Sequence, residues 1–256
     1  MKRSVVSFVG AGPGDPELIT LKGLRRLRDA DVVLHDRLIP ASLLDEVSSS
    51  ATVIDVGKAP GRQCMGQGHI NWLLVDWAQR REHVVRLKGG DPAVFGRLGE
   101  EIEAVRSAGI AVEVIPGGTA ATAAAARLGI SLTERGSASS VVFATGTDRS
   151  GHCPSALDWD VLARIEGTLV FYMSVGALDS ITASLTSLGR DSREPAILVE
   201  HAGVAGERVI AARLGEIAVE ARAADVKSPA VLITGPTVSA ASVPLTVRRV
   251  STHVSV

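Results

Sequence analysis

The run Val84–Leu87 is a short apolar strand pattern that leads through Lys88 into the loop Gly89–Pro92. Two adjacent glycines allow a backbone to approach a ligand where any side chain would collide. Pro92 then fixes the direction in which the chain leaves the loop. Ligands of open α/β sheets bind outside the carboxyl ends of the strands. Asp91, the acid of this loop, and the glycines beside it are therefore candidates for a ligand-binding site.

A second glycine-rich loop, Gly10–Pro16, follows the first apolar run. It does not fit the dinucleotide-binding fingerprint, because the third glycine would fall at Asp15. Pro13 has no amide hydrogen, which a pyrophosphate-binding loop would use. The chain also has no segment of the P-loop pattern. The loop therefore favours a flat or uncharged ligand that lies against the backbone.

Two further strand ends carry polar side chains that could transfer protons or bind anions. Asp36 and Arg37 follow the run that ends at His35, and Lys58 follows the run that ends at Val56. Asp36 and Arg37 could equally form a structural ion pair, and Lys58 could simply be solvated. The pairs Cys64 with His69 and His152 with Cys153 lack the spacing and the ligand number of a zinc site, so we expect no metal.

The composition limits the class of protein. The chain has 256 residues, of which 46% are hydrophobic and 21% charged, as in a globular protein of one or two domains. Its net charge of −1 excludes a general basic field for nucleic acid. No apolar run reaches the roughly 18 residues of a membrane-spanning helix, and two cysteines are too few for a disulfide scaffold. We expect a cytoplasmic protein without a nucleic-acid or membrane partner.

Short apolar runs alternate with helical patterns, which predicts an α/β fold. The expected strands are Val5–Val9, Val32–His35, Val53–Val56, Val84–Leu87, Val112–Ile115, Val141–Thr145, Leu169–Met173, Ala196–Glu200 and Ala230–Thr234. The expected helices include Leu21–Arg28, capped by Thr20, Ile70–Arg80 and Glu100–Ala108. Pro116 and two glycines break the pattern before an alanine-rich stretch. We place one domain at 1–116, a second at 117–240 and a partly disordered tail at 241–256.

Together these loops resemble the tetrapyrrole methylase family, over most of the chain from Val5 to Gly235. The resemblance rests above all on two long, ordered motifs, Val9–Leu18 and Val85–Phe95. Shorter motifs that support it are Thr20–Lys22, Asp36–Leu38, Val56–Lys58, Gln67 with Ile70 and Asn71, Gly96 with Arg97, Glu100 with Glu101, Pro116 with Gly117, Thr119 with Ala120, Gly129 with Ile130, Leu132 with Thr133, Tyr172 with Met173, and Pro195 with Ala196.

The resemblance implies two α/β domains with a cleft between them, assembled as a homodimer. It also implies S-adenosyl-L-methionine as cofactor, which agrees with loops unsuited to phosphate because this cofactor has none. The residues that match the family's cofactor contacts are Pro13, Gly89, Gly90, Asp91, Val94, Thr119, Ala120, Met173 and Ala202.

The implied reaction is methyl transfer from a sulfonium to a pyrrole carbon of uroporphyrinogen III, twice in succession, which gives precorrin-2. Asp36 matches the family's proposed general base and Lys58 its proposed general acid. The tetrapyrrole is ringed by carboxylates, which guanidinium groups bind in a bidentate manner. The residues expected to bind them are Arg37, Arg62, Arg97, Arg135 and Arg149, together with Lys58.

Several positions depart from the family pattern: Ala93, Leu98, Gly118, Ser131, Glu134, Thr147 and Ser174. Most lie in the expected cofactor and substrate loops, and Glu134 would place an acid near a polyanionic substrate. One alternative is therefore a related methylase that acts on a later corrin intermediate or another acceptor. A nucleotide-dependent reductase is disfavoured by Pro13 and Asp15. A binder without turnover is a third alternative, for which Glu134 is the single indication.

Overall fold

A computed structural model describes residues 4–57, 65–148, 150–240 and 248–249. Its contacts divide the chain into two compact units, Met1–Thr119 and Ala120–Val256. The predicted residues Lys58, Arg62 and Arg149 lie outside the described part of the chain, as does most of the predicted tail.

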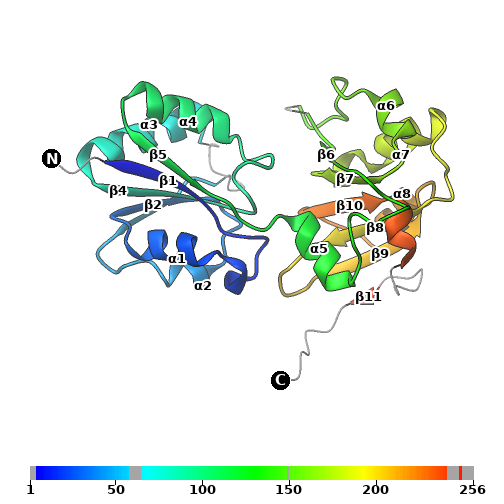
Figure 1. Cartoon of the computed structure of the whole chain (residues 1–256), viewed down its shortest axis with the longest axis horizontal. Helices are drawn as coiled ribbons and strands as arrows, with labels where there is room; N and C mark the ends of the chain where they lie inside the picture. Colours follow the sequence, from blue (N-terminus) through cyan, green and yellow to red (C-terminus); the bar gives the residue numbers. More distant parts are fainter. Residues whose placement is uncertain (1–3, 58–64, 149, 241–247, 250–256) are drawn as a thin grey trace. The chain divides into compact units, whose positions relative to one another are not determined.

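The first unit is a five-stranded parallel sheet in the order β3-β2-β4-β1-β5, with helices on both faces (Figure 1). Its strands are β1 (Val5–Gly10), β2 (Val32–His35), β3 (Thr52–Asp55), β4 (His83–Lys88) and β5 (Ala111–Ile115). Its helices are the short 3-10 helix η1 (Pro16–Leu18), α1 (Leu21–Arg28), α2 (Ala41–Leu44), α3 (Gln67–Arg80) and α4 (Leu98–Ser107).

Alternating side chains of the strands build one apolar layer on each face of this sheet. Val6 and Phe8 of β1 pack in the layer that contains Leu74 of α3. Val9 packs in the opposite layer with Leu27 of α1. The expected cap of α1 is confirmed, because the Thr20 hydroxyl accepts a hydrogen bond from the Gly23 amide at 3.1 Å. The layers leave the carboxyl ends of the five strands at one edge, where the loops begin.

A half-buried cluster of Lys22, Arg26 and Glu113 joins α1 to β5. We expect it to make the free energy of unfolding depend on pH. Hydrogen bonding and charge from Arg26 and Lys22 lower the pKa of Glu113 from 4.5 to about 2, at contact distances of 2.7 and 2.6 Å. A carboxyl whose pKa is lower in the folded state stabilises the fold above its unfolded pKa, and this contribution is lost as pH falls toward 2. At neutral pH it amounts to at most about 3 kcal/mol.

Glu113→Gln is therefore expected to lower the free energy of unfolding at pH 7 by about 1–3 kcal/mol and to have little effect near pH 2. Urea denaturation at both pH values measures this difference. Glu46, which pairs with Arg28 at an exposed position, provides the control, because surface pairs contribute about 0–1 kcal/mol. Equal losses at the two pH values would contradict the assigned role of the Glu113 charge.

The second unit is a six-stranded mixed sheet in the order β11-β9-β8-β10-β7-β6. Its strands are β6 (Val141–Thr145), β7 (Thr168–Tyr172), β8 (Pro195–Glu200), β9 (Arg208–Arg213), β10 (Ala230–Thr234) and β11 (Arg248–Arg249). Its helices are α5 (Ala120–Leu128), α6 (Trp159–Arg164), α7 (Leu178–Ser187) and α8 (Ile217–Ala223), with short 3-10 turns η2 (Val175–Ala177) and η3 (Pro236–Ala240).

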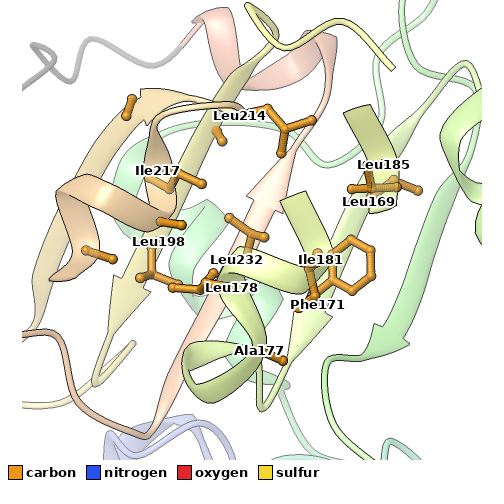
Figure 2. Packing of buried hydrophobic residues seen from close by; sticks show 14 of the residues in the cluster. Leu169, Phe171, Ala177, Leu178, Ile181, Leu185, Leu198, Leu214, Ile217 and Leu232 are labelled. Carbon is orange, nitrogen blue, oxygen red and sulfur yellow. The ribbon is translucent and has the colours of Figure 1, made fainter. Parts of the chain in front are cut away.

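Each face of the mixed sheet is covered by helices. Figure 2 shows one layer, in which Phe171 of β7 and Leu198 of β8 pack with Ile181 of α7 and Ile217 of α8. The alanine-rich helix α5 covers the other face, where Ala124 and its neighbours are buried against the strands. Small side chains allow this close approach of helix to sheet.

The strands expected in both halves are present, with bounds that differ by a residue or so. The third runs from Thr52 to Asp55 rather than from Val53 to Val56, and the sequence pattern missed β9 and β11. Arg248 and Arg249, which lie in the predicted tail, pair with β9. No helix in the described ranges is long and apolar enough to cross a membrane.

Candidate functional site

Three glycine loops at the carboxyl edge of the parallel sheet touch one another through their backbones. A Cβ atom on Gly10 would lie 2.6 Å from the Gly117 nitrogen, and one on Gly117 would lie 2.4 Å from the Gly90 carbonyl oxygen. Gly12 and Gly90 exchange two backbone hydrogen bonds, of 3.2 and 2.8 Å. Any side chain at Gly10 or Gly117 would push the loops apart. We call these three loops, 10–12, 89–91 and 117–118, the backbone platform.

The Asp91 carboxylate joins two loops of the backbone platform. One oxygen accepts a hydrogen bond from the Ala93 amide at 2.7 Å, and the other accepts one from the Gly117 amide at 3.0 Å. Both oxygens thus have partners within the protein, one of them in the loop that follows β5. Asp91 is predicted from the sequence to be a cofactor contact, and the structure shows that its carboxylate also links the loop 89–91 to the loop 117–118.

The loop after Asp91 has an unusual backbone. Phe95 and Arg97 have φ values of 53° and 54°, which non-glycine residues rarely adopt. A Cβ on Gly96 would lie 2.4 Å from the Pro92 carbonyl oxygen. The guanidinium of Arg97 binds the Glu100 carboxylate of α4 at 2.9 and 2.7 Å. Strained backbone of this kind gathers at ligand-binding sites, which supports a binding role for the loop carrying Val94.

Asp36 lies at the end of β2. Its carboxylate contacts Arg86 of β4 and Gly89 of the loop that follows β4. Arg86 Nη2 donates to one oxygen at 2.5 Å, and the Gly89 amide donates to the other at 3.2 Å. The side chain is still 35% exposed, so a reacting group can reach it. Arg37, the next residue, is exposed. Lys58, the expected partner of Asp36, lies outside the described residues.

A buried charged network extends from Asp36 beneath the loop 89–97. Arg86 and Lys88 lie on the same face of β4 as the apolar Val84, and Glu101 of α4 binds both. Gln67 of α3 donates to the same carboxylate at 3.0 Å. Desolvation lowers the pKa of Lys88, and the charge of Arg86 lowers it further, whereas Glu101 raises it.

Sequence reasoning did not select Arg86, Lys88 or Glu101 as functional residues. The signal for two of them was present, because charged side chains two apart in an apolar strand fall on one face of the sheet. Their partner on α4 could not be chosen without the fold.

In the second unit, Met173 and Ala202 follow two strands that run in the same direction. Both β7 and β8 are antiparallel to β10, so their carboxyl ends lie at one edge of the sheet. Met173 and His201 each adopt a left-handed backbone, with φ values of 55° and 53°, directly after their strands. Met173 is 49% exposed, whereas Ala202 is buried. The structure thus brings two predicted cofactor contacts of this unit to one edge.

Arg135 stands in a tight loop of the second unit. Glu134 and Ala138 exchange backbone hydrogen bonds of 2.9 Å around the turn. The Ser137 hydroxyl donates to the Glu134 carboxylate at 2.6 Å, and Gly136 has a φ of 86°. Arg135 lies at the exposed turn of this loop. The Glu134 carboxylate, which departs from the family pattern, is therefore bonded to its own loop.

Ser174, another departure from the family pattern, is fully buried and follows the exposed Met173. Its hydroxyl has no hydrogen-bond partner within the described residues. Space around it is tight, since a Cβ on Gly146 would lie 2.6 Å from the Ser174 Cα. An unpaired buried hydroxyl destabilises a fold by about 1–3 kcal/mol.

Ser174→Ala is expected to raise the free energy of unfolding by about 1 kcal/mol, because it removes the unpaired oxygen and keeps the Cβ. Thr168→Val is the matched control. Thr168 is also fully buried, but its hydroxyl bonds that of Thr237 at 3.0 Å, so this change should lower stability. Denaturant unfolding of both variants gives the comparison, and a loss of stability in Ser174→Ala would show that the hydroxyl has a partner.

The predicted site residues therefore fall into two groups. Those at the carboxyl edge of the first unit or in its loops are Pro13, Asp36, Arg37, Gly89, Gly90, Asp91, Val94, Arg97 and Thr119. Those in the second unit are Ala120, Arg135, Met173 and Ala202. In the described ranges, no group of three or more His, Cys, Asp or Glu side chains could hold a metal ion.

Comparison with known proteins identifies the family of the chain. The family model described as Tetrapyrrole (Corrin/Porphyrin) Methylases matches residues 5–218. The uroporphyrinogen-III C-methyltransferase of Bacillus subtilis strain 168 is 43% identical over 239 residues, which cover 93% of this chain and 50% of that protein. The chain spans about half the length of the first curated relatives that it matches.

Two solved structures share the fold. The uroporphyrin-III C-methyl transferase of Thermus thermophilus, complexed with S-adenyl homocysteine, has a TM-score of 0.80 and 42% identity, over 93% of this chain and 100% of that chain. A cobalamin biosynthetic enzyme, cobalt precorrin-4 methyltransferase, has a TM-score of 0.82 but 26% identity, over 91% of this chain and 95% of that one.

Proposed function

The chain belongs to the tetrapyrrole methylase family, and we propose that it is an S-adenosyl-L-methionine-dependent C-methyltransferase that converts uroporphyrinogen III to precorrin-2 by two successive methylations. The observation that carries the proposal is the 42% identity to the Thermus thermophilus methyl transferase, with full coverage of that chain. The lower identity of 26% to the cobalt precorrin-4 methyltransferase favours uroporphyrinogen III over a later corrin intermediate.

The backbone platform fits the proposed cofactor. Gly89 is exposed, and a Cβ placed on it would meet the Leu38 Cβ only at 4.0 Å. Pro13 lies against Gly118, where a Cβ would be 3.4 Å from the proline ring. These positions offer backbone surface without an array of amides that would favour phosphate. When bound, the cofactor supplies an electrophilic methyl group on a sulfonium sulfur. The proposed contacts are Pro13, Gly89, Gly90, Asp91, Val94 and Thr119 in the first unit, and Ala120, Met173 and Ala202 in the second.

The proposed reaction requires a proton to leave the methylated tetrapyrrole. Asp36 is our candidate for the base, because its carboxylate is partly exposed and held by Arg86 and Gly89. Lys58 is our candidate for the acid, on the strength of the family pattern. Holding the acceptor carbon in line with the sulfonium supplies much of the acceleration, since orientation removes entropy from the barrier.

Arginine side chains are proposed to bind the carboxylates of the tetrapyrrole. Arg37 is exposed beside Asp36, and Arg135 is exposed on its turn. Arg97 is held by Glu100, which fixes the orientation of its guanidinium. Arg62 and Arg149 belong to the same proposed set of carboxylate-binding residues. We also propose a cytoplasmic location and a homodimer. Sedimentation velocity tests the oligomeric state.

Turnover with S-adenosyl-L-methionine and freshly generated uroporphyrinogen III tests the proposed function directly. We expect the addition of two methyl groups, which absorbance and mass spectrometry detect. Cofactor binding by calorimetry without methylation would overturn the substrate assignment and direct the search to a later corrin intermediate. Absence of both would overturn the cofactor assignment as well.

A further inference from the structure

We propose that Glu101 is a positioning residue, which fixes the Asp36 carboxylate through Arg86 and supports the loop 92–97 through Lys88. This inference rests on the proposed function for its catalytic consequence, whereas the structural consequence can be measured without turnover. Glu101 is 1% exposed and lies on α4, so its carboxylate is shielded from solvent.

The first path runs through the guanidinium of Arg86, whose nitrogens all have partners. Nε lies 3.4 Å from Glu101, Nη1 donates to the carbonyl oxygens of Leu34 and Leu87, and Nη2 donates to Asp36. A planar group held at every corner cannot rotate at one end alone. The orientation that Glu101 and the two carbonyls impose on Arg86 is therefore passed on to Asp36.

The second path runs through Lys88, whose ammonium group lies 3.0 Å from both Glu101 oxygens. Its Cε lies 3.1 Å from the place where a Cβ on Gly96 would be, so the side chain runs beneath the strained loop. The buried carboxylate of Glu101 thus binds both Lys88, which supports this loop, and Arg86, which orients Asp36.

Stability alone does not account for this network. Val84 occupies the same face of β4 and is fully buried in the apolar layer. Replacing a buried ion pair by apolar side chains of similar size is often neutral or stabilising. The network contains two cations and two carboxylates, so its charges balance. An apolar pair at Lys88 and Glu101 would keep that balance and fill the same space, but it could not hold Arg86.

The test is the double variant Lys88→Met with Glu101→Met, made in the whole 256-residue chain. It removes one charge of each sign and leaves Arg86 opposite Asp36. We expect the unfolding midpoint to be retained, the affinity for S-adenosyl-L-methionine to fall because the loop that carries Val94 loses its support, and kcat to fall at least about tenfold. Hydrogen exchange at the Gly89 amide, which binds Asp36, is expected to quicken while the core amides of β1 and β4 keep their protection.

Glu101→Gln, which keeps the shape of the side chain, carries the same readouts if the double variant does not fold. Glu113→Gln is the matched control, because it removes an ion-paired carboxylate from the other face of the sheet and should leave Gly89 exchange and kcat unchanged. Unchanged Gly89 exchange in a folded variant would overturn the proposal. A uniform loss of protection across the unit would overturn it too, by assigning the network to stability. Failure of the wild-type chain to methylate uroporphyrinogen III would refute the proposed function. The positioning of Asp36 by Glu101 would then be decided by hydrogen exchange at the Gly89 amide alone.

Discussion

Asp91→Ala is expected to weaken the binding of S-adenosyl-L-methionine by about 10- to 100-fold, because the bond from the Gly117 amide to this charged carboxylate, which contributes about 1.5–3 kcal/mol, joins two loops of the backbone platform. The change removes the bonds to Ala93 and Gly117 and frees the loop after β5 from the loop after β4. Isothermal titration calorimetry of the variant against the wild-type chain measures the loss. Unchanged affinity would show that the glycine motif has been misinterpreted.

Gly117→Ala tests whether Asp91 affects cofactor binding by holding the loops together or by touching the cofactor itself. It leaves the Asp91 carboxylate in place, but its Cβ would meet the Gly90 carbonyl oxygen at 2.4 Å, so the backbone platform must open. Both variants should therefore lose affinity. Asp158→Ala, which removes a carboxylate that caps α6 by accepting from Val161, should lower stability by about 1 kcal/mol and keep the affinity. Full affinity in Gly117→Ala would contradict a binding role for the backbone platform.

Asp36→Asn is expected to lower kcat for methylation by about 100- to 10,000-fold, the usual contribution of a general base. The amide side chain keeps the size of the carboxylate but cannot take a proton. Cofactor affinity should change by less than about threefold, since the loops of the backbone platform are held by other contacts. Turnover assays with uroporphyrinogen III, together with calorimetry, separate the two effects.

Asp31→Asn is the matched control for Asp36, because Asp31 precedes the same strand at its other end. Its carboxylate accepts hydrogen bonds from the amides of Glu82 and His83, so the change should affect stability and leave turnover intact. Full activity of Asp36→Asn would remove Asp36 from the catalytic role and leave its contact with Gly89 as its task.

Much of the fold could be predicted from local patterns. Apolar runs located the strands at the centre of both sheets, and the Thr20 cap placed the start of α1. The sequence pattern did not predict the strand β9 (Arg208–Arg213), because this segment begins and ends with arginine, which is typical of exposed segments. Arg208 is bonded to Glu200 of β8, a partner that the fold supplies.

The sequence by itself determined the positions of the glycine loops and strand ends, because glycine and proline act on the backbone within a few residues. It also determined family membership, through two long motifs. Tertiary structure decided what the polar side chains in those loops do. Asp91 meets Gly117 across 26 positions of the chain, and Asp36 meets Arg86 across 50. These meetings depend on the order β3-β2-β4-β1-β5, which places β4 between β2 and β1. Strand order follows from how whole layers pack, and no local pattern of side chains encodes it.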